Sequence, residues 1–200
     1  MCAANLDLVA ADFAPGAVLA DMHQVHGSTI AVVEERRSAA RPDADALVTT
    51  RPDTVLVVRV ADCVPVLLAD PDAGVVAAVH AGRPGLVAGV APAAVRQMRD
   101  LGAGAVVAWL GPRVCGGCYE VPEAMQADVA ALVPEALATT SWGTPSLDIG
   151  AGVRAQLEAA GVTVHDVGAC TRESADLYSY RRDGAGAGRF AGLVRRRADG

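Results

Sequence analysis

The chain has 200 residues, of which 52% are hydrophobic and 20% are charged, with a formal net charge of −6 at pH 7. This length predicts a single domain over residues 1–200 with a core of its own, and no apolar run is long enough to span a membrane. The acidic balance and the scattered arginines exclude a broad basic face, so we expect neither nucleic acid nor a membrane as a partner. All 17 basic residues are arginine, which excludes Schiff-base chemistry and a phosphate-loop lysine.

The first third of the chain is dominated by short apolar runs. Residues 1–16 predict only a helical turn or two, ending near Pro15-Gly16. The runs that follow predict strands at 17–22, 29–33, 46–50, 54–60, 65–69 and 75–79. The run at 54–60 is apolar on both faces, which is typical of a buried strand. Asp70-Pro71-Asp72-Ala73-Gly74 is typical of a hairpin turn.

After Gly82 the spacing of apolar residues changes from that of strands to that of helices. Positions 86, 90, 94, 95 and 98 recur on one helical face, and Gly102 supplies a stop. The later elements are a strand at 105–110, a glycine-rich loop at 111–117, helices at 122–132 and 148–160, strands at 162–167 and 189–194, and a loose tail at 195–200. Strands that outnumber helices and come largely as hairpins predict an α+β fold with mixed sheets.

Three metal-ligand residues stand at the ends of apolar runs. His26, Cys63 and His80 form the kind of set that a catalytic zinc uses when one position stays open. Their gaps of 37 and 17 residues match no compact zinc-finger pattern. The residue types therefore leave a second interpretation open, in which Cys63 is a nucleophile, one histidine is its base, and Asp62 or Asp45 orients that base.

Cys115-Gly116-Gly117-Cys118 has the spacing of a redox pair or of half a zinc site. The sequence shows no second pair of this kind and no strand-to-helix context like that of thioredoxin. We therefore interpret the segment as a glycine-rich connection with incidental cysteines.

Tyrosine and arginine gather near the end of the chain. Tyr178 and Tyr180 stand beside Arg181-Arg182-Asp183 and Arg189. The group suits either a wall that holds an anion or a base, or an exposed connection with internal ion pairs.

The five cysteines are odd in number and unevenly spaced, and the chain is larger than those that need disulfide staples. No charged segment followed by an apolar run opens the sequence. A cytoplasmic location is the resulting expectation. The sequence leaves the oligomeric state open.

Several short motifs follow one another in the order of a known family. They are Gln24-Val25-His26-Gly27, Asp45-Ala46-Leu47-Val48-Thr49, Ala61-Asp62-Cys63-Val64-Pro65-Val66, His80-Ala81-Gly82, Gly111-Pro112, Cys118-Tyr119-Glu120-Val121, Leu147-Asp148, Cys170-Thr171, Ser179-Tyr180-Arg181-Arg182-Asp183 and Gly188-Arg189-Phe190. From about Asn5 to Val194 the chain resembles the YfiH-type laccase-domain family, also called polyphenol oxidase or peptidoglycan editing factor.

The resemblance implies an α+β fold in which mixed β-sheets form a sandwich flanked by helices. It also implies one zinc held by His26, Cys63 and His80, with copper as a possible substitute because both metals accept these ligands. The implied activity is phosphorolysis of adenosine, inosine, guanosine or methylthioadenosine, together with adenosine deamination. Nucleoside and phosphate are the implied small-molecule partners.

Further roles are expected from the same resemblance. Glu120 or Asp62 is the candidate for proton transfer. The candidates for binding substrate or phosphate are Arg181, Arg182, Arg189 and Arg83. A conventional multicopper oxidase is disfavoured, because a trinuclear cluster needs many more than the four histidines present.

Two departures from the family pattern leave alternatives open. Arg83-Pro84 stands where the family has Trp-Arg, and Asn5-Leu6 stands where it has Asn-Arg, with the usual N-terminal strand segment missing before it. These changes favour a shortened fold and an alternative function as a zinc-binding relic, a nucleoside-binding or envelope-associated partner. A metal-independent hydrolase that uses Cys63 is the third hypothesis.

Overall fold

The computed structural model describes residues 3–34 and 41–197. Its helices are α1 (Ala3–Phe13), α2 (Arg83–Val87), α3 (Val90–Asp100), α4 (Glu123–Ala130), α5 (Ile149–Ala159) and α6 (Tyr180–Asp183). Its strands are β1 (Val18–Ala20), β2 (Ile30–Val32), β3 (Ala46–Thr49), β4 (Thr54–Val60), β5 (Val64–Asp70), β6 (Val75–Ala81), β7 (Val107–Leu110), β8 (Leu137–Thr139), β9 (Pro145–Leu147), β10 (Thr163–Asp166) and β11 (Phe190–Arg195). No described helix is long and apolar enough to cross a membrane.

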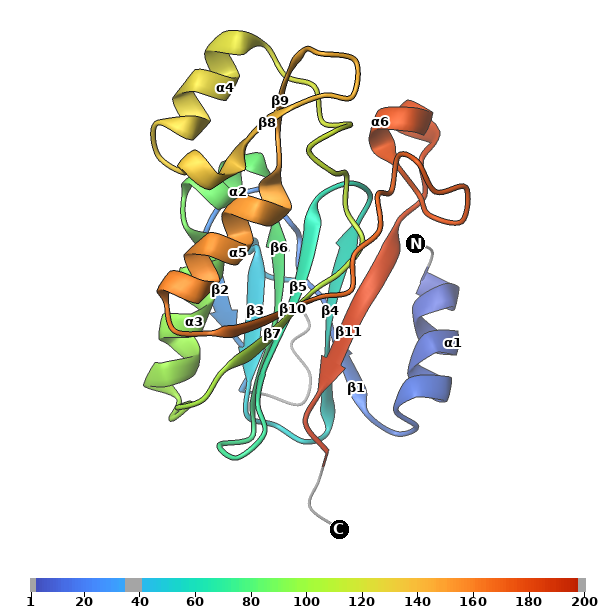
Figure 1. The fold of residues 1–200 in the computed structure, drawn as a ribbon. Coiled ribbons are helices and arrows are strands. Elements are labelled where there is room, and N and C mark those ends of the chain that lie inside the picture. Colours follow the sequence, from blue (N-terminus) through green and yellow to red (C-terminus); the bar gives the residue numbers. More distant parts are fainter. Residues whose placement is uncertain (1–2, 35–40, 198–200) are drawn as a thin grey trace.

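Two mixed sheets pack face to face between helical layers (Figure 1). The smaller sheet has the order β1-β4-β11, with β1 parallel and β11 antiparallel to β4. The larger sheet has the order β10-β7-β5-β6-β3-β2. Helix α1 covers the outer face of the smaller sheet, and α2, α3 and α5 lie over the larger one (Figure 1). The predicted α+β fold with flanked mixed sheets is therefore confirmed.

Three apolar clusters hold these layers together. The largest joins the larger sheet to α3 and α5, and the second fills the space between the two sheets. A small third cluster seats α1 on the smaller sheet through Ala14, Val55 and Val57. With so few aromatic residues, the core consists mostly of Val, Ala and Leu. Burial of this apolar surface supplies the main stabilising free energy.

Local chemistry explains where several elements begin and end. The predicted hairpin turn at 70–74 joins β5 to β6 as an antiparallel pair. The Asp70 carboxylate accepts four backbone N–H bonds there, from Asp72, Ala73, Gly104 and Ala105. Asp148 caps α5 by accepting from the amide of Ala151 at 2.8 Å.

Other elements depart from the sequence prediction. Helix α1 is 11 residues long, because its apolar side packs on the smaller sheet. The single helix expected after Gly82 is two helices, divided at Gly89, whose φ of 71° lies in the left-handed region. The β8–β9 pair and α6 were not predicted. Arg195 still belongs to β11, and Arg196 donates to the Thr50 carbonyl, so the expected loose tail does not begin at 195; residues 198–200 lie outside the described chain.

Candidate metal centre

The candidate site lies where the chain crosses from the smaller sheet to the larger one. Strand β4 ends at Val60, only three residues intervene, and β5 begins at Val64. The β5–β6 register pairs Val64 with Ala81 and Pro65 with His80, so Cys63 lies beside the end of β6. His26 reaches the same place from the connection between β1 and β2. The fold thus brings together residues that are far apart in the sequence.

The three predicted ligands converge on one point. One ligand atom from each of His26, Cys63 and His80 lies within 4.8 Å of the others. The Cys63 Sγ is 3.8 Å from His26 Nε2, and the two imidazole rings meet edge to face with centroids 4.7 Å apart. A Cβ at Gly82 would lie 2.8 Å from His26 Cδ2 and 3.2 Å from the Cys63 sulfur. Glycine therefore leaves the space in which these side chains can converge on an ion.

A buried carboxylate organises the two histidines. Asp45, fully buried, lies 2.8 Å from His80 Nδ1 and accepts the amides of His26 and Gly27 at 2.9 and 2.6 Å. Its contact with Nδ1 leaves His80 Nε2 available as a ligand. The amide contacts hold His26 at φ 62°, a left-handed conformation that needs such support. The donor set and its supporting carboxylate fit a soft or borderline metal ion such as zinc or copper.

The charges in the metal-free site favour a thiolate beside an imidazolium. Burial alone would raise the pKa of Cys63, but hydrogen bonds with His26 and His80 outweigh it and lower the pKa to about 7. Burial alone would lower the pKa of His80, but the bond to Asp45 and the neighbouring Cys63 raise it to about 9. The site therefore offers a deprotonated sulfur near neutral pH, which is the form that binds metal.

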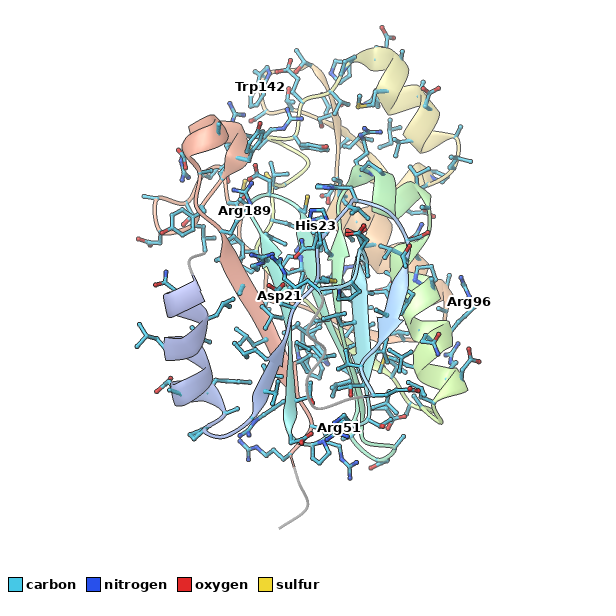
Figure 2. The ribbon with its side chains drawn as sticks, turned by 180° about the vertical axis from the view of Figure 1, so that it is seen from behind. Asp21, His23, Arg51, Arg96, Trp142 and Arg189 are labelled. Carbon is cyan, nitrogen blue, oxygen red and sulfur yellow. The ribbon has the colours of Figure 1, made fainter. Side chains whose placement is uncertain are left out.

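A cavity of about 880 Å³ opens over these ligands. Figure 2 shows His23 and Arg189, two of its lining residues, at the end of the sheets next to α6. The wall is formed by His23, Gln24, Arg59, Val60, Ala61, Asp62, Tyr119, Tyr180, Arg181 and Arg189, in addition to the three ligands. The Arg181 guanidinium lies 4.2 Å from the centroid of the Tyr119 ring. A volume of this size, with aromatic and cationic walls, suits an anionic or heteroaromatic small molecule.

The predicted arginines separate into two groups. Arg181 and Arg189 line the cavity. Arg182 is not among the described lining residues; it pairs with Asp183 and donates to main-chain carbonyls, including those of Thr171 and Ser174. Arg83 begins α2 and is not among the described lining residues. Leu6, the other departure from the family pattern, packs with α1 on the outer sheet face.

The two acidic candidates also differ in position. Asp62 lines the cavity, with its carboxylate accepting from Thr171 Oγ1 at 2.6 Å and from the Arg181 amide at 2.7 Å. Its φ of 92° is in the left-handed region, which these bonds hold in place. Glu120 is exposed and outside the lining, and its main-chain carbonyl accepts from Arg181.

Sequence reasoning assigned no role to several residues of the wall, among them Arg59, Gln24 and Tyr119. Arg59 interrupts an otherwise apolar strand, and that interruption was the available signal. Gln24 fixes the neighbouring loop by exchanging hydrogen bonds with the Arg59 main chain at 2.7 and 2.9 Å. Gln24 and Tyr119 each stand within a motif of the family pattern, which was the available signal for them. Only the fold shows that these side chains share one cavity.

The fold and site define an α+β sandwich with a cysteine–histidine centre at the base of an open cavity. The chain belongs to the family described as multi-copper polyphenol oxidoreductase laccase, whose model matches residues 2–197.

Curated relatives carry a different description. A purine nucleoside phosphorylase of Streptomyces coelicolor is 59% identical over 179 residues, covering 86% of this chain and 73% of its own. A purine nucleoside phosphorylase of Deinococcus radiodurans is 40% identical, covering 96% of this chain and 73% of its own.

Solved structures show the same fold. A Neisseria meningitidis protein of the DUF152 family has a TM-score of 0.84 and 31% identity, covering 97% of this chain and 80% of its own. The Bacillus licheniformis protein YfiH has a TM-score of 0.84 and 27% identity, covering 94% and 78%.

Proposed function

We propose that this chain is a zinc-dependent purine nucleoside phosphorylase. The observation that carries the proposal is one cavity in which a Cys-His-His set, two tyrosine rings and three arginines face the same volume. Relatives named purine nucleoside phosphorylase support the same assignment. The substrates are then a purine nucleoside and inorganic phosphate.

Arginine is the residue that would hold the phosphate. Phosphorolysis requires a phosphate oxygen to attack the C1′ carbon of the ribose while the bond from C1′ to the purine nitrogen breaks. Arg59, Arg181 and Arg189 are the cations of the cavity wall, and guanidinium groups bind phosphate with paired hydrogen bonds. Fixing phosphate and nucleoside side by side removes much of the entropic cost of their reaction.

The purine base requires a flat apolar surface and a proton. We assign the stacking surface to Tyr119 or Tyr180, whose rings line the cavity. The departing purine takes up a proton at nitrogen, and we assign its transfer to Asp62 in preference to Glu120, because only Asp62 lines the cavity. Asp62 also positions Arg181 through its amide, so the Asp62→Asn variant tests both roles.

The metal is proposed to be zinc, bound by His26, Cys63 and His80. A zinc ion there supplies a Lewis acid that stabilises negative charge. Copper accepts the same ligands. The description of the family as copper oxidases fits this chain poorly, since it has only four histidines. Of the two that are not proposed ligands, His23 lines the cavity but pairs with Asp43, and His165 stacks on Trp109.

The direct test is incubation of the purified chain with adenosine and phosphate. We expect adenine and ribose 1-phosphate from the native protein, and no product from Cys63→Ala. Arg96→Ala, on the exposed side of α3, is the matched control that should retain activity. We propose adenosine deamination as a second activity of the same site, and inosine formed without phosphate would reveal it. If a chain with stoichiometric zinc forms no product, the proposed phosphorylase function is refuted.

A second candidate is a cysteine hydrolase that needs no metal. The lowered pKa of Cys63, about 7, and the nearby His26 imidazole favour it. This alternative would be established, and the zinc enzyme excluded, if the chain kept full hydrolytic activity after exhaustive chelation and the Cys63→Ser variant lost that activity.

A further inference from the structure

A second group of metal-binding side chains lies beside the cavity wall. It consists of Cys115, Cys118, Cys170 and Glu173, whose ligand atoms all lie within 4.8 Å of one another; we call it the sulfur cluster. None of its members belongs to the centre described above. The sequence interpretation treated Cys115 and Cys118 as incidental because no second pair was visible. The fold supplies two further ligands, Cys170 and Glu173, from a segment more than fifty residues later.

Main-chain hydrogen bonds shape the cluster as two facing turns. The amides of Cys118 and Tyr119 both donate to the Cys115 carbonyl at 3.0 Å, and the Ser174 amide donates to the Cys170 carbonyl at 3.0 Å. Arg113 ties the two turns together, since it donates to Ala169 and accepts from Thr171. The ligand atoms are therefore held in place by backbone structure that does not depend on an ion.

Glu173 is the acidic member of the cluster, and its carboxylate is in contact with one of the three sulfurs. The Cys118 Sγ lies 3.3 Å from Glu173 Oε1, and within the described chain Glu173 has no ion pair with a basic residue. A thiol that coordinates a divalent ion is deprotonated, so an ion held here would bind Cys118 as a thiolate together with the Glu173 carboxylate.

We propose that the sulfur cluster binds one structural zinc ion in a closed, four-coordinate site. Three sulfurs and one carboxylate oxygen provide a complete tetrahedral set, and sulfur-rich tetrahedral sites select zinc. A disulfide would use only two of the three sulfurs.

The position of the cluster gives the zinc a structural task. Tyr119, which follows Cys118, lines the cavity. Thr171, which follows Cys170, donates to Asp62 at 2.6 Å, next to Cys63. A zinc that joins the two turns fixes this side of the cavity wall, whatever reaction the cavity performs.

The test is a zinc count on the full chain and on variants, after loading with zinc and dialysis. We expect about two zinc ions in the native chain, one in Cys63→Ala and one in Cys118→Ser. Glu173→Gln should bind the second ion at least about tenfold more weakly. Glu135→Gln, an exposed glutamate outside the cluster, is the matched control and should keep two. X-ray absorption on zinc-loaded Cys63→Ala should show three sulfur neighbours at about 2.3 Å.

If Cys118→Ser fails to fold, the Cys63→Ala variant still decides the test, because the Cys63→Ala substitution lies outside the sulfur cluster. A Cys63→Ala chain that retains no zinc after loading and dialysis would overturn the proposal. A disulfide within the cluster in the native chain would also overturn it. If the native chain holds one zinc that survives in Cys63→Ala and is lost in Cys118→Ser, the sulfur cluster stands and the zinc centre of the proposed enzyme fails.

Discussion

Replacing Gly82 with alanine should weaken zinc binding at the proposed His26–Cys63–His80 centre without unfolding the chain. Gly82 has φ −83° and ψ 177°, an extended backbone that alanine adopts without strain. The new methyl group would lie 2.8 Å from His26 Cδ2 and 3.2 Å from the Cys63 sulfur. The effect is therefore steric and falls on two of the three proposed ligands.

The magnitude follows from the distance that His26 must move. Ordinary contact begins at 3.4 Å, so the imidazole has to retreat by about half an ångström. A displacement of that size takes a ligand outside the tolerance of a working metal site. We expect zinc affinity to fall about 10- to 100-fold, equivalent to about 1.4–2.7 kcal/mol. The imidazole is exposed and can move aside, so the metal-free chain should lose less than about 1 kcal/mol.

Competition with a chromogenic chelator measures the zinc affinity, and denaturant unfolding of the metal-free chains measures stability. Gly104→Ala is the matched control, because no atom lies within 4 Å of the added Cβ and its φ is not positive. Zinc binding by Gly82→Ala as tight as that of the native chain would refute the argument. A decrease in the free energy of unfolding of more than about 2 kcal/mol would show instead that the His26 imidazole cannot move aside.

Three further predictions concern Asp45, Asp70 and Arg189. Asp45→Asn should weaken zinc binding about 10- to 100-fold in the same chelator assay, because His80 loses the carboxylate that orients it. Asp70→Asn should lower the free energy of unfolding by about 2–3 kcal/mol near pH 7, since the Asp70 carboxylate accepts four amides. These bonds, chiefly that from Ala73, lower the pKa of Asp70. The contribution of Asp70 to the free energy of unfolding is therefore present above about pH 4 and is lost as the pH falls through its folded-state pKa. A difference in unfolding free energy between native chain and variant that stays the same in acid would contradict this. Arg189→Ala should raise the phosphate KM at least about tenfold but not the nucleoside KM, measured by steady-state kinetics, with Arg96→Ala unchanged.

Much of the secondary structure could be predicted because it depends on local patterns. Strands β4 to β6 follow from continuous apolar runs, and the turn at 70–74 from proline, aspartate and glycine. The split of the helix at Gly89 and the pairing of β8 with β9 have weaker local signals. These features depend on packing against neighbours that lie elsewhere in the sequence.

The sequence by itself determined the residue types of the centre and, through its motifs, the candidates His26, Cys63 and His80. Only the tertiary structure decided that they converge, because the convergence comes from the short crossing between β4 and β5 and from the β5–β6 register. It also separated Arg181 and Arg189, which line the cavity, from Arg182, which is not among the described lining residues. The sulfur cluster is the clearest case, since side-chain proximity across fifty residues depends on how the two turns pack and leaves no local pattern to detect.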